Sequence, residues 1–239
     1  VASLAALVVL WQIGSSLAGP RLLPDPVTMA RIIVAETADG SLPYHVGVTL
    51  ARVAVAFAIS MAIGSAIGLA MGRLKRLDGF FDSWLVLFLN VPALVTIVLC
   101  YVWFGLVEAA AIAAVAVNKI PTVVVTVREG ARALDRGHLE MAQVFRIGRW
   151  KTLRHVVVPA LAPFLLAAAR SGLALIWKIV LVVELIGRSN GVGFQINVFF
   201  QFFDVAHILA YTIAFVVVIQ MVEWFLLRPL ELRATRWRR

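Results

Sequence analysis

Long uninterrupted apolar runs constrain this chain more than any other feature of its sequence. Six windows of about 19 residues are almost entirely apolar, and each can cross roughly 30 Å of hydrocarbon as a helix. The chain is 62% hydrophobic and only 15% charged, which excludes a soluble globule. We therefore expect an all-α membrane protein with about six transmembrane helices. The predicted spans are Val1–Ala18, Thr49–Met71, Phe80–Phe104, Leu106–Val127, Ala160–Ile186 and Ala206–Leu227.

Basic residues are distributed unevenly between the two ends of these spans. Most of the 22 Lys and Arg residues lie in the links after the second and fourth spans and in the C-terminal tail. Only Arg21, Arg31 and Arg188 lie outside the spans on the opposite side. Because positively charged loops stay in the cytoplasm, we expect a bacterial inner-membrane protein with both termini inside. This topology explains the net charge of +9, so nucleic acid is not an expected partner, whereas membrane lipid is.

This topology predicts a single transmembrane domain over residues 1–239. Its parts are a periplasmic segment at 19–48, a cytoplasmic loop at 128–159, a periplasmic loop at 187–205 and a basic cytoplasmic tail at 228–239. Within the first segment, prolines precede a short helix expected at Val27–Glu36. Because Val1 lies inside an apolar run without the basic start of a signal peptide, we expect a few cytoplasmic residues before it.

Two further local patterns make structural predictions. The third and fourth spans are separated only by Phe104–Leu106, which predicts a tight turn. In the second span, small residues recur every fourth position and form one stripe, which lets another helix approach closely. Packing within the chain and a contact with a second copy both explain this stripe. The residues are Ser60, Gly64, Gly68 and Gly72.

The cytoplasmic loop contains residues in a specific order: Glu140-Met141-Ala142, Arg146, Gly148, Val156 and Val158-Pro159. This order resembles the EAA loop of binding-protein-dependent ABC importer permeases. That pattern is Glu-Ala-Ala, three residues, Gly, nine residues, Ile, one residue and Leu-Pro. Glu140, Ala142 and Pro159 match it, whereas Arg146 stands at the glycine position, where glycine allows a turn between two short helices.

The resemblance extends over nearly the whole chain. Several segments look like those of permeases for nitrate, taurine and alkanesulfonates, namely Leu22–Pro26, Trp103–Gly105, Arg149-Trp150, Glu184–Gly187 and Gly191–Phe194. Permeases of this group often have extra prolines in the third span, after the position of Pro92. Ala93 and Val98 occupy such places here, so the third span is expected to be less broken than usual.

The resemblance implies a set of partners and a fold, that of a type I ABC importer permease. Two permease copies would pair, two ATP-binding-cassette ATPases would bind ATP and Mg beneath them, and a periplasmic binding protein would deliver the solute. The loop would form a coupling helix that contacts an ATPase through Met141, Ala142 and Phe145. Glu140 and the arginines would form a polar rim.

The chain itself is not expected to be an enzyme or to bind a metal. A phosphate-binding loop ends in Gly-Lys, and none of the lysines follows a glycine. The histidines show no metal-ligand spacing.

Ionisable residues within the fifth span suggest where a solute passes. Arg170, Lys178 and Glu184 lie on one face of a helix, and Asn118 lies in the fourth span. One hypothesis is that these translocation-path candidates, chiefly Lys178, attract an anionic solute. The alternatives are a structural ion-pair network that contains Lys178 and Glu184, or a Lys178 side chain that only reaches to the membrane interface.

A nitrate-, sulfonate- or taurine-like anion is the expected solute. A vitamin precursor or an aromatic carboxylate is the alternative within the same class. A secondary transporter is the alternative from a different class, although it would show internal repeats that are not evident here.

Overall fold

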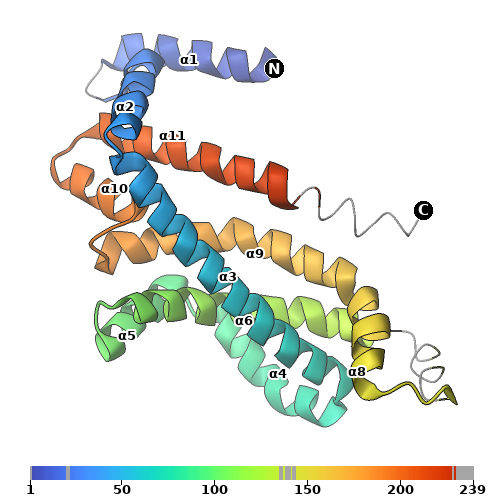
Figure 1. Ribbon diagram of the computed structural model, residues 1–239. Coiled ribbons are helices and arrows are strands. Elements are labelled where there is room, and N and C mark those ends of the chain that lie inside the picture. Colours follow the sequence, from blue (N-terminus) through green and yellow to red (C-terminus); the bar gives the residue numbers. More distant parts are fainter. Residues whose placement is uncertain are drawn as a thin grey trace. The chain divides into compact units, whose positions relative to one another are not determined.

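The computed structural model of the protein describes residues 2–19, 22–134, 137, 141, 144–227 and 229. These residues are almost entirely helical, and no strand occurs among them. The α-helices, labelled in Figure 1, are α1 (Ala2–Ala18), α2 (Pro26–Ala38), α3 (Ser41–Arg73), α4 (Lys75–Asn90), α5 (Ala93–Phe104), α6 (Glu108–Arg132), α8 (Arg149–Thr152), α9 (Val158–Gly187), α10 (Val192–Gln201) and α11 (Val205–Val222). Two π-helices follow α8 and α11, namely η1 (Leu153–Val157) and η2 (Glu223–Leu227).

Four helical segments of the described residues are long and apolar enough to cross a membrane, and the bent pair α4–α5 makes a fifth candidate. The four are Ser41–Arg73, Glu108–Arg132, Trp150–Gly187 and Val205–Phe225. They coincide with the second, fourth, fifth and sixth predicted spans. The first predicted span corresponds to the shorter apolar helix α1. The prediction of an all-α membrane protein is confirmed.

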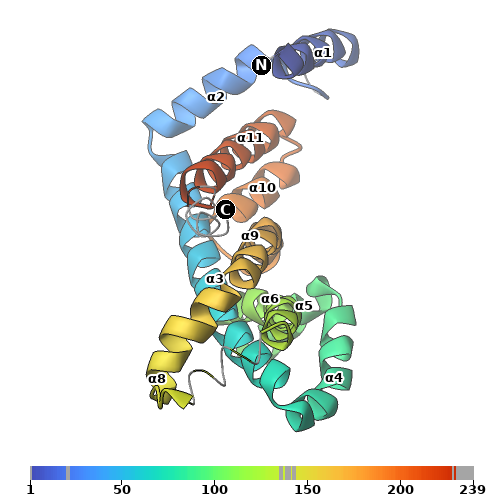
Figure 2. The same cartoon turned by 90° about the vertical axis from the view of Figure 1, so that its right-hand side faces the viewer.

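The third predicted span is broken, which contradicts the expectation of a more continuous helix. Helices α4 and α5 meet at an angle of 95°, and Figure 2 shows their different directions. Pro92 lacks an N–H group and disfavours helical geometry at the residue before it. Val91 is accordingly extended, and the Asn90 side chain donates a hydrogen bond of 2.7 Å from Nδ2 to the backbone carbonyl of Val86. One proline is therefore enough to break this helix.

The turn between α5 and α6 is as tight as expected. Gly105 adopts a positive φ of 77° at the end of α5, and α6 begins at Glu108. A residue with a Cβ atom is strained in this conformation. The prediction of a tight turn at Phe104–Leu106 is confirmed.

The chain forms two compact units, whose boundaries fall inside α3, inside α9 and inside η2. One unit comprises Val1–Arg52 and Val180–Trp224, and the other comprises Val53–Ile179 and Phe225–Arg239. We call them the first and second unit.

Close packing of α3 against α6 forms the centre of the second unit. An added Cβ atom at Gly64 would lie 2.7 Å from Cβ of Val123, and one at Gly68 would lie 2.7 Å from the carbonyl oxygen of Val124. Such distances are too short for any side chain larger than that of glycine. The small residues of α3 therefore serve packing within the chain, one of the two explanations considered for their spacing.

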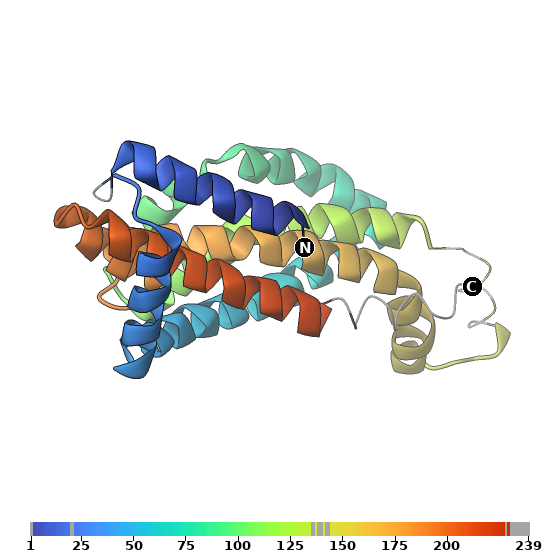
Figure 3. The same cartoon turned by 90° about the horizontal axis from the view of Figure 1, so that it is seen from above.

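In the first unit, α2 and α10 pack against α11, and Figure 3 shows α2 crossing α11. The Asp25 carboxylate accepts hydrogen bonds from the Val27 and Thr28 amides and so caps α2, confirming the helix predicted at Val27–Glu36. The Tyr211 hydroxyl of α11 donates a hydrogen bond of 2.6 Å to Glu36. This buried tyrosine fixes α2 to α11.

Candidate functional site

An exposed apolar surface follows α6 in the second unit. Met141 is 43% exposed and Phe145 is 73% exposed, and Val144 and Trp150 are exposed as well. Glu140 and Ala142, two predicted coupling residues, lie outside the described residues. These exposed apolar side chains lie close together in the sequence, and apolar surface left exposed is typical of a protein-binding site.

Arg146 has the backbone conformation that glycine adopts freely. Its φ is 50°, in the left-handed region, at the position where the EAA pattern has glycine. Holding a residue with a Cβ atom there costs roughly 1 kcal/mol. Arg146 therefore makes the turn in spite of its side chain. Gly148, two residues later, has open space around it and is not at a positive φ.

The end of the loop runs into a helix that contains a π-helical turn. Residues Leu153–Val157 are π-helical, and the Val158 amide bonds to the carbonyl of Leu153. Pro159, the next residue, has no N–H group and would crowd a regular α-helix. The wider π-turn before Pro159 accommodates this defect.

Both ends of the loop are held together by packing within the second unit. Ala131 near the end of α6 forms a buried cluster with Val157 and Leu161. A Cβ atom at Gly130 would overlap the ring of Phe164. This packing joins the end of α6 to the start of α9 on either side of the loop.

An ion-pair network links the end of α6 to the start of α4. Arg128 contacts Asp78 at 3.3 Å and also pairs with Asp82. Arg132 pairs with Asp78 and contacts Glu129 at 2.8 Å. Sequence reasoning did not identify Asp78 or Asp82, because their partners lie about 50 residues away in sequence, with no local spacing to suggest the pairing.

The predicted path residues of the second unit are dispersed. Lys178 is exposed, and its Nζ lies 5.5 Å from the centre of the Trp177 ring. Arg170 is also exposed, and it lies about 12 Å from Lys178 along α9, given 1.5 Å per residue. Asn118 of α6 is half-buried.

Glu184 is fully buried at the centre of a polar cluster in the first unit. It pairs with Arg52 at 2.7 Å and accepts hydrogen bonds of 2.9 Å from the Thr49 hydroxyl and the Gly193 amide. Arg52 donates a further hydrogen bond of 2.8 Å to the carbonyl of Asn190. The geometry is that of a structural cluster joining α3, α9 and the start of α10.

Two neighbouring groups extend this cluster. His45 Nδ1 accepts a hydrogen bond of 3.0 Å from the Gly191 amide, and the Thr49 hydroxyl accepts one of 2.9 Å from the Val192 amide. Gly191 has a φ of 107°, and a Cβ atom there would overlap the Glu184 carboxylate. The Gly191–Phe194 segment therefore needs its first glycine so that the backbone can approach the buried acid.

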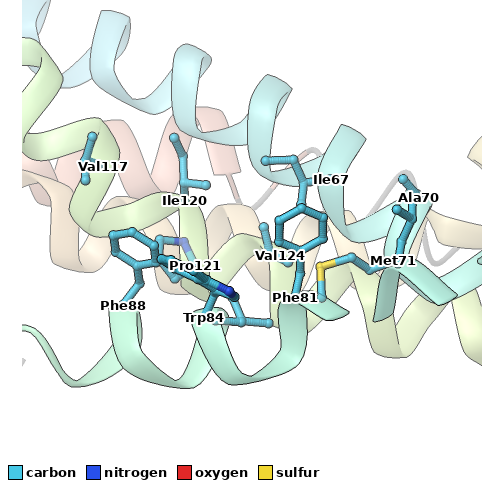
Figure 4. Close-up of a pocket in the computed structure, with 12 residues that line it drawn as sticks. Ile67, Ala70, Met71, Phe81, Trp84, Phe88, Val117, Ile120, Pro121 and Val124 are labelled. Carbon is cyan, nitrogen blue, oxygen red and sulfur yellow. The ribbon is translucent and has the colours of Figure 1, made fainter. Parts of the chain in front are cut away.

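The second unit contains an apolar cavity of about 410 Å³ between α3, α4 and α6. Figure 4 shows Trp84, Phe88, Ile67 and Pro121 around it. Apolar walls of this kind do not suit an anion. No group of three or more His, Cys, Asp or Glu side chains arranged to hold a metal occurs in the part of the chain that the structure describes.

Similarity to characterised proteins covers nearly the whole chain. The putative aliphatic sulfonates transport permease protein SsuC of Bacillus subtilis is 30% identical over 236 residues, or 98% of this chain and 85% of the relative. The taurine transport system permease protein TauC of Escherichia coli is 26% identical, and the match covers 99% of this chain and 88% of the relative. The riboflavin transport system permease protein RibX of Chloroflexus aurantiacus is 31% identical, and the match covers 98% of this chain and 88% of the relative.

The fold is also found in a solved structure. An inward-facing conformation of the MetNI methionine ABC transporter matches with a TM-score of 0.65 at 17% identity, covering 78% of this chain and 94% of that chain. The relatives and the apolar helices together define a multi-pass membrane subunit of an ABC importer. Residues 54–227 match the binding-protein-dependent transport system inner membrane component family, and the chain belongs to this family. It is a permease subunit that works with ATPase subunits.

Proposed function

We propose that this permease imports a small organosulfonate anion across the bacterial inner membrane. Similarity to the sulfonate and taurine permeases over almost the full chain supports this substrate class. In the proposed complex two copies of this chain form the path, and a periplasmic binding protein delivers the solute. Partner ATPases bind ATP and Mg, and the chain has no ATPase site of its own. The whole chain acts as one transmembrane domain with both termini in the cytoplasm.

The observation that carries the coupling role is the exposed apolar surface of Met141 and Phe145. In the proposed mechanism this surface enters a groove of an ATPase, with Glu140 and Ala142 contributing from the same loop. Closure of the ATPase dimer then moves the loop. Because both ends of the loop are packed together, α6 and α9 move with it.

Co-purification with the ATPase tests the coupling surface. Phe145→Ala is expected to weaken binding of the ATPase about thirtyfold, since truncating a buried aromatic anchor costs about 2 kcal/mol at an interface. Phe202→Ala is the matched control, because Phe202 is 78% exposed and lies in the loop expected to be periplasmic. Equal retention of the ATPase by both variants would contradict the coupling role.

Uptake into proteoliposomes tests the substrate. The complete complex is expected to accumulate radiolabelled ethanesulfonate in a manner that requires ATP and the binding protein. A vitamin is the second candidate, favoured by the riboflavin permease among the relatives. Accumulation of riboflavin but not ethanesulfonate would replace the first proposal with the second.

A further inference from the structure

Lys119 is a buried cation without a hydrogen-bond partner. It lies in α6 of the second unit, is 2% exposed, and its Nζ is enclosed and unbonded among the described residues. A Cβ atom added at Gly172 of α9 would lie 3.2 Å from Lys119 Cε and 4.0 Å from Nζ. The same point is 3.6 Å from the ring of Phe57. The ammonium thus lies between α6 and α9 beside apolar atoms.

Other buried charges of the described chain have partners. Arg52 and Glu184, each no more than 3% exposed, pair with one another. An ammonium group in an apolar interior without a counter-ion is unfavourable, and ionisable residues inside membrane proteins usually face a path or a partner. Lys119 has the burial of a structural residue but lacks the contacts that a structural ion pair would provide.

Helices α6 and α9 are packed together next to the loop, whereas Lys119 and Gly172 face one another farther along the two helices. A small change in helix spacing there would expose the ammonium to an anion. Gly172 has no side chain to cover the ammonium from the side of α9. Asn118, the preceding residue, is half-buried and supplies a hydrogen-bond donor on the same helix. The loop between α6 and α9 connects these two helices, so the proposed movement of the loop acts on this site.

We propose that Lys119 binds the anionic group of the solute during transport, and that the described structure holds this residue in a closed state. The ligand class is a small oxyanion, with a sulfonate as the first expectation. This inference rests on the proposed import of an anion and assigns its binding residue. It differs from the expectation for Lys178, which is exposed and lies beside Trp177.

Uptake and stability measured together test the assignment. In proteoliposomes containing the complete complex, Lys119→Met is expected to lower ethanesulfonate uptake about tenfold or more, because a charge-assisted contact with the solute is lost. Lys119→Arg keeps the charge and is expected to retain more uptake than Lys119→Met. Lys75→Met, at an exposed lysine at the start of α4, should transport like the wild type. The melting temperature of Lys119→Met should equal or exceed that of the wild type, since an uncompensated buried charge is removed.

Two outcomes would overturn the assignment directly. Uptake by Lys119→Met equal to that of the wild type would show that the ammonium does not bind the solute. A lower melting temperature together with lost uptake would indicate a structural role instead.

A panel of solutes separates failure of this inference from failure of the proposed substrate. If the wild-type complex imports bicarbonate but not ethanesulfonate, and Lys119→Met abolishes that import, the substrate is wrong and the inference stands. If the wild type imports only neutral riboflavin, the inference is overturned.

If the wild type imports none of these solutes, the inference is tested by the accessibility of position 119 to an anionic thiol reagent. Lys119→Cys is made in a Cys100→Ser background, which removes the one native cysteine. Labelling by the anionic reagent 2-sulfonatoethyl methanethiosulfonate during ATP turnover is expected. The absence of labelling would overturn the inference.

Discussion

Removing the buried acid of the first unit should be among the most destabilising single changes in the chain. Glu184→Ala removes the carboxylate that lies 2.7 Å from Arg52, a residue that is only 3% exposed in the native chain. Thr49 and the Gly193 amide lose their acceptor as well. Leaving one partner of a buried ion pair uncompensated costs about 3 to 5 kcal/mol. For a chain of this size, that corresponds to a fall in melting temperature of roughly 6 to 20 °C.

The measurement is thermal unfolding in detergent, monitored by size-exclusion chromatography, with Gln201→Ala as the control. Gln201 is exposed at the end of α10 in the first unit, and its replacement should change stability by less than about 0.5 kcal/mol.

A double variant separates the cost of the unpaired charge from the loss of packing. Arg52→Leu with Glu184→Leu removes both charges, and replacing an entire buried pair by apolar residues is often neutral. The double variant is therefore expected to be more stable than Glu184→Ala alone. The explanation would be refuted if the double variant lost as much stability as Arg52→Leu and Glu184→Leu lose together as single variants. A loss of stability below about 1 kcal/mol for Glu184→Ala would refute it as well.

Three further changes test the packing, the loop and the cap. Gly68→Ala should cost about 1 to 3 kcal/mol by overpacking α3 against α6, measured by thermal unfolding, whereas Gly79→Ala, with open space around it, should be neutral or stabilising. Arg146→Gly should relieve roughly 1 kcal/mol of backbone strain and leave co-purification with the ATPase intact. Loss of co-purification would indicate that the Arg146 side chain itself contacts the ATPase. The hydrogen bonds from Thr28 hold the pKa of Asp25 below its usual 3.8, so the cap of α2 is complete above that pH and is lost as the pH falls further. Amide exchange in the first turn of α2, corrected for intrinsic rates, should then accelerate only below pH 3.8, and acceleration near neutral pH would contradict this.

Much of the fold was predictable because apolar runs and glycine spacing are local features. The windows around α3, α6, α9 and α11 give the long helices directly. The turn at Gly105 follows from the short interval between two apolar runs.

Other features depend on backbone geometry or distant partners. The break at Pro92 was underestimated because apolar composition continues through it, although a single missing N–H group is enough to end a helix. The pairing of Arg52 with Glu184 spans 132 residues, and no sequence spacing predicts it. Arg146 was recognised as a departure from the glycine pattern, but only its φ reveals that the backbone turn is kept.

The pairing across 132 residues also has a consequence for how the chain is made. Arg52 enters the membrane with α3, and Glu184 is synthesised about 7 to 26 s later at 5 to 20 residues per second. Throughout that interval the guanidinium lacks the Glu184 carboxylate, so other groups, such as water or lipid headgroups, must take its place. The first unit closes only when α9 emerges. Ribosome-bound chains that end before Glu184 are therefore expected to expose this region to protease and membrane quality control.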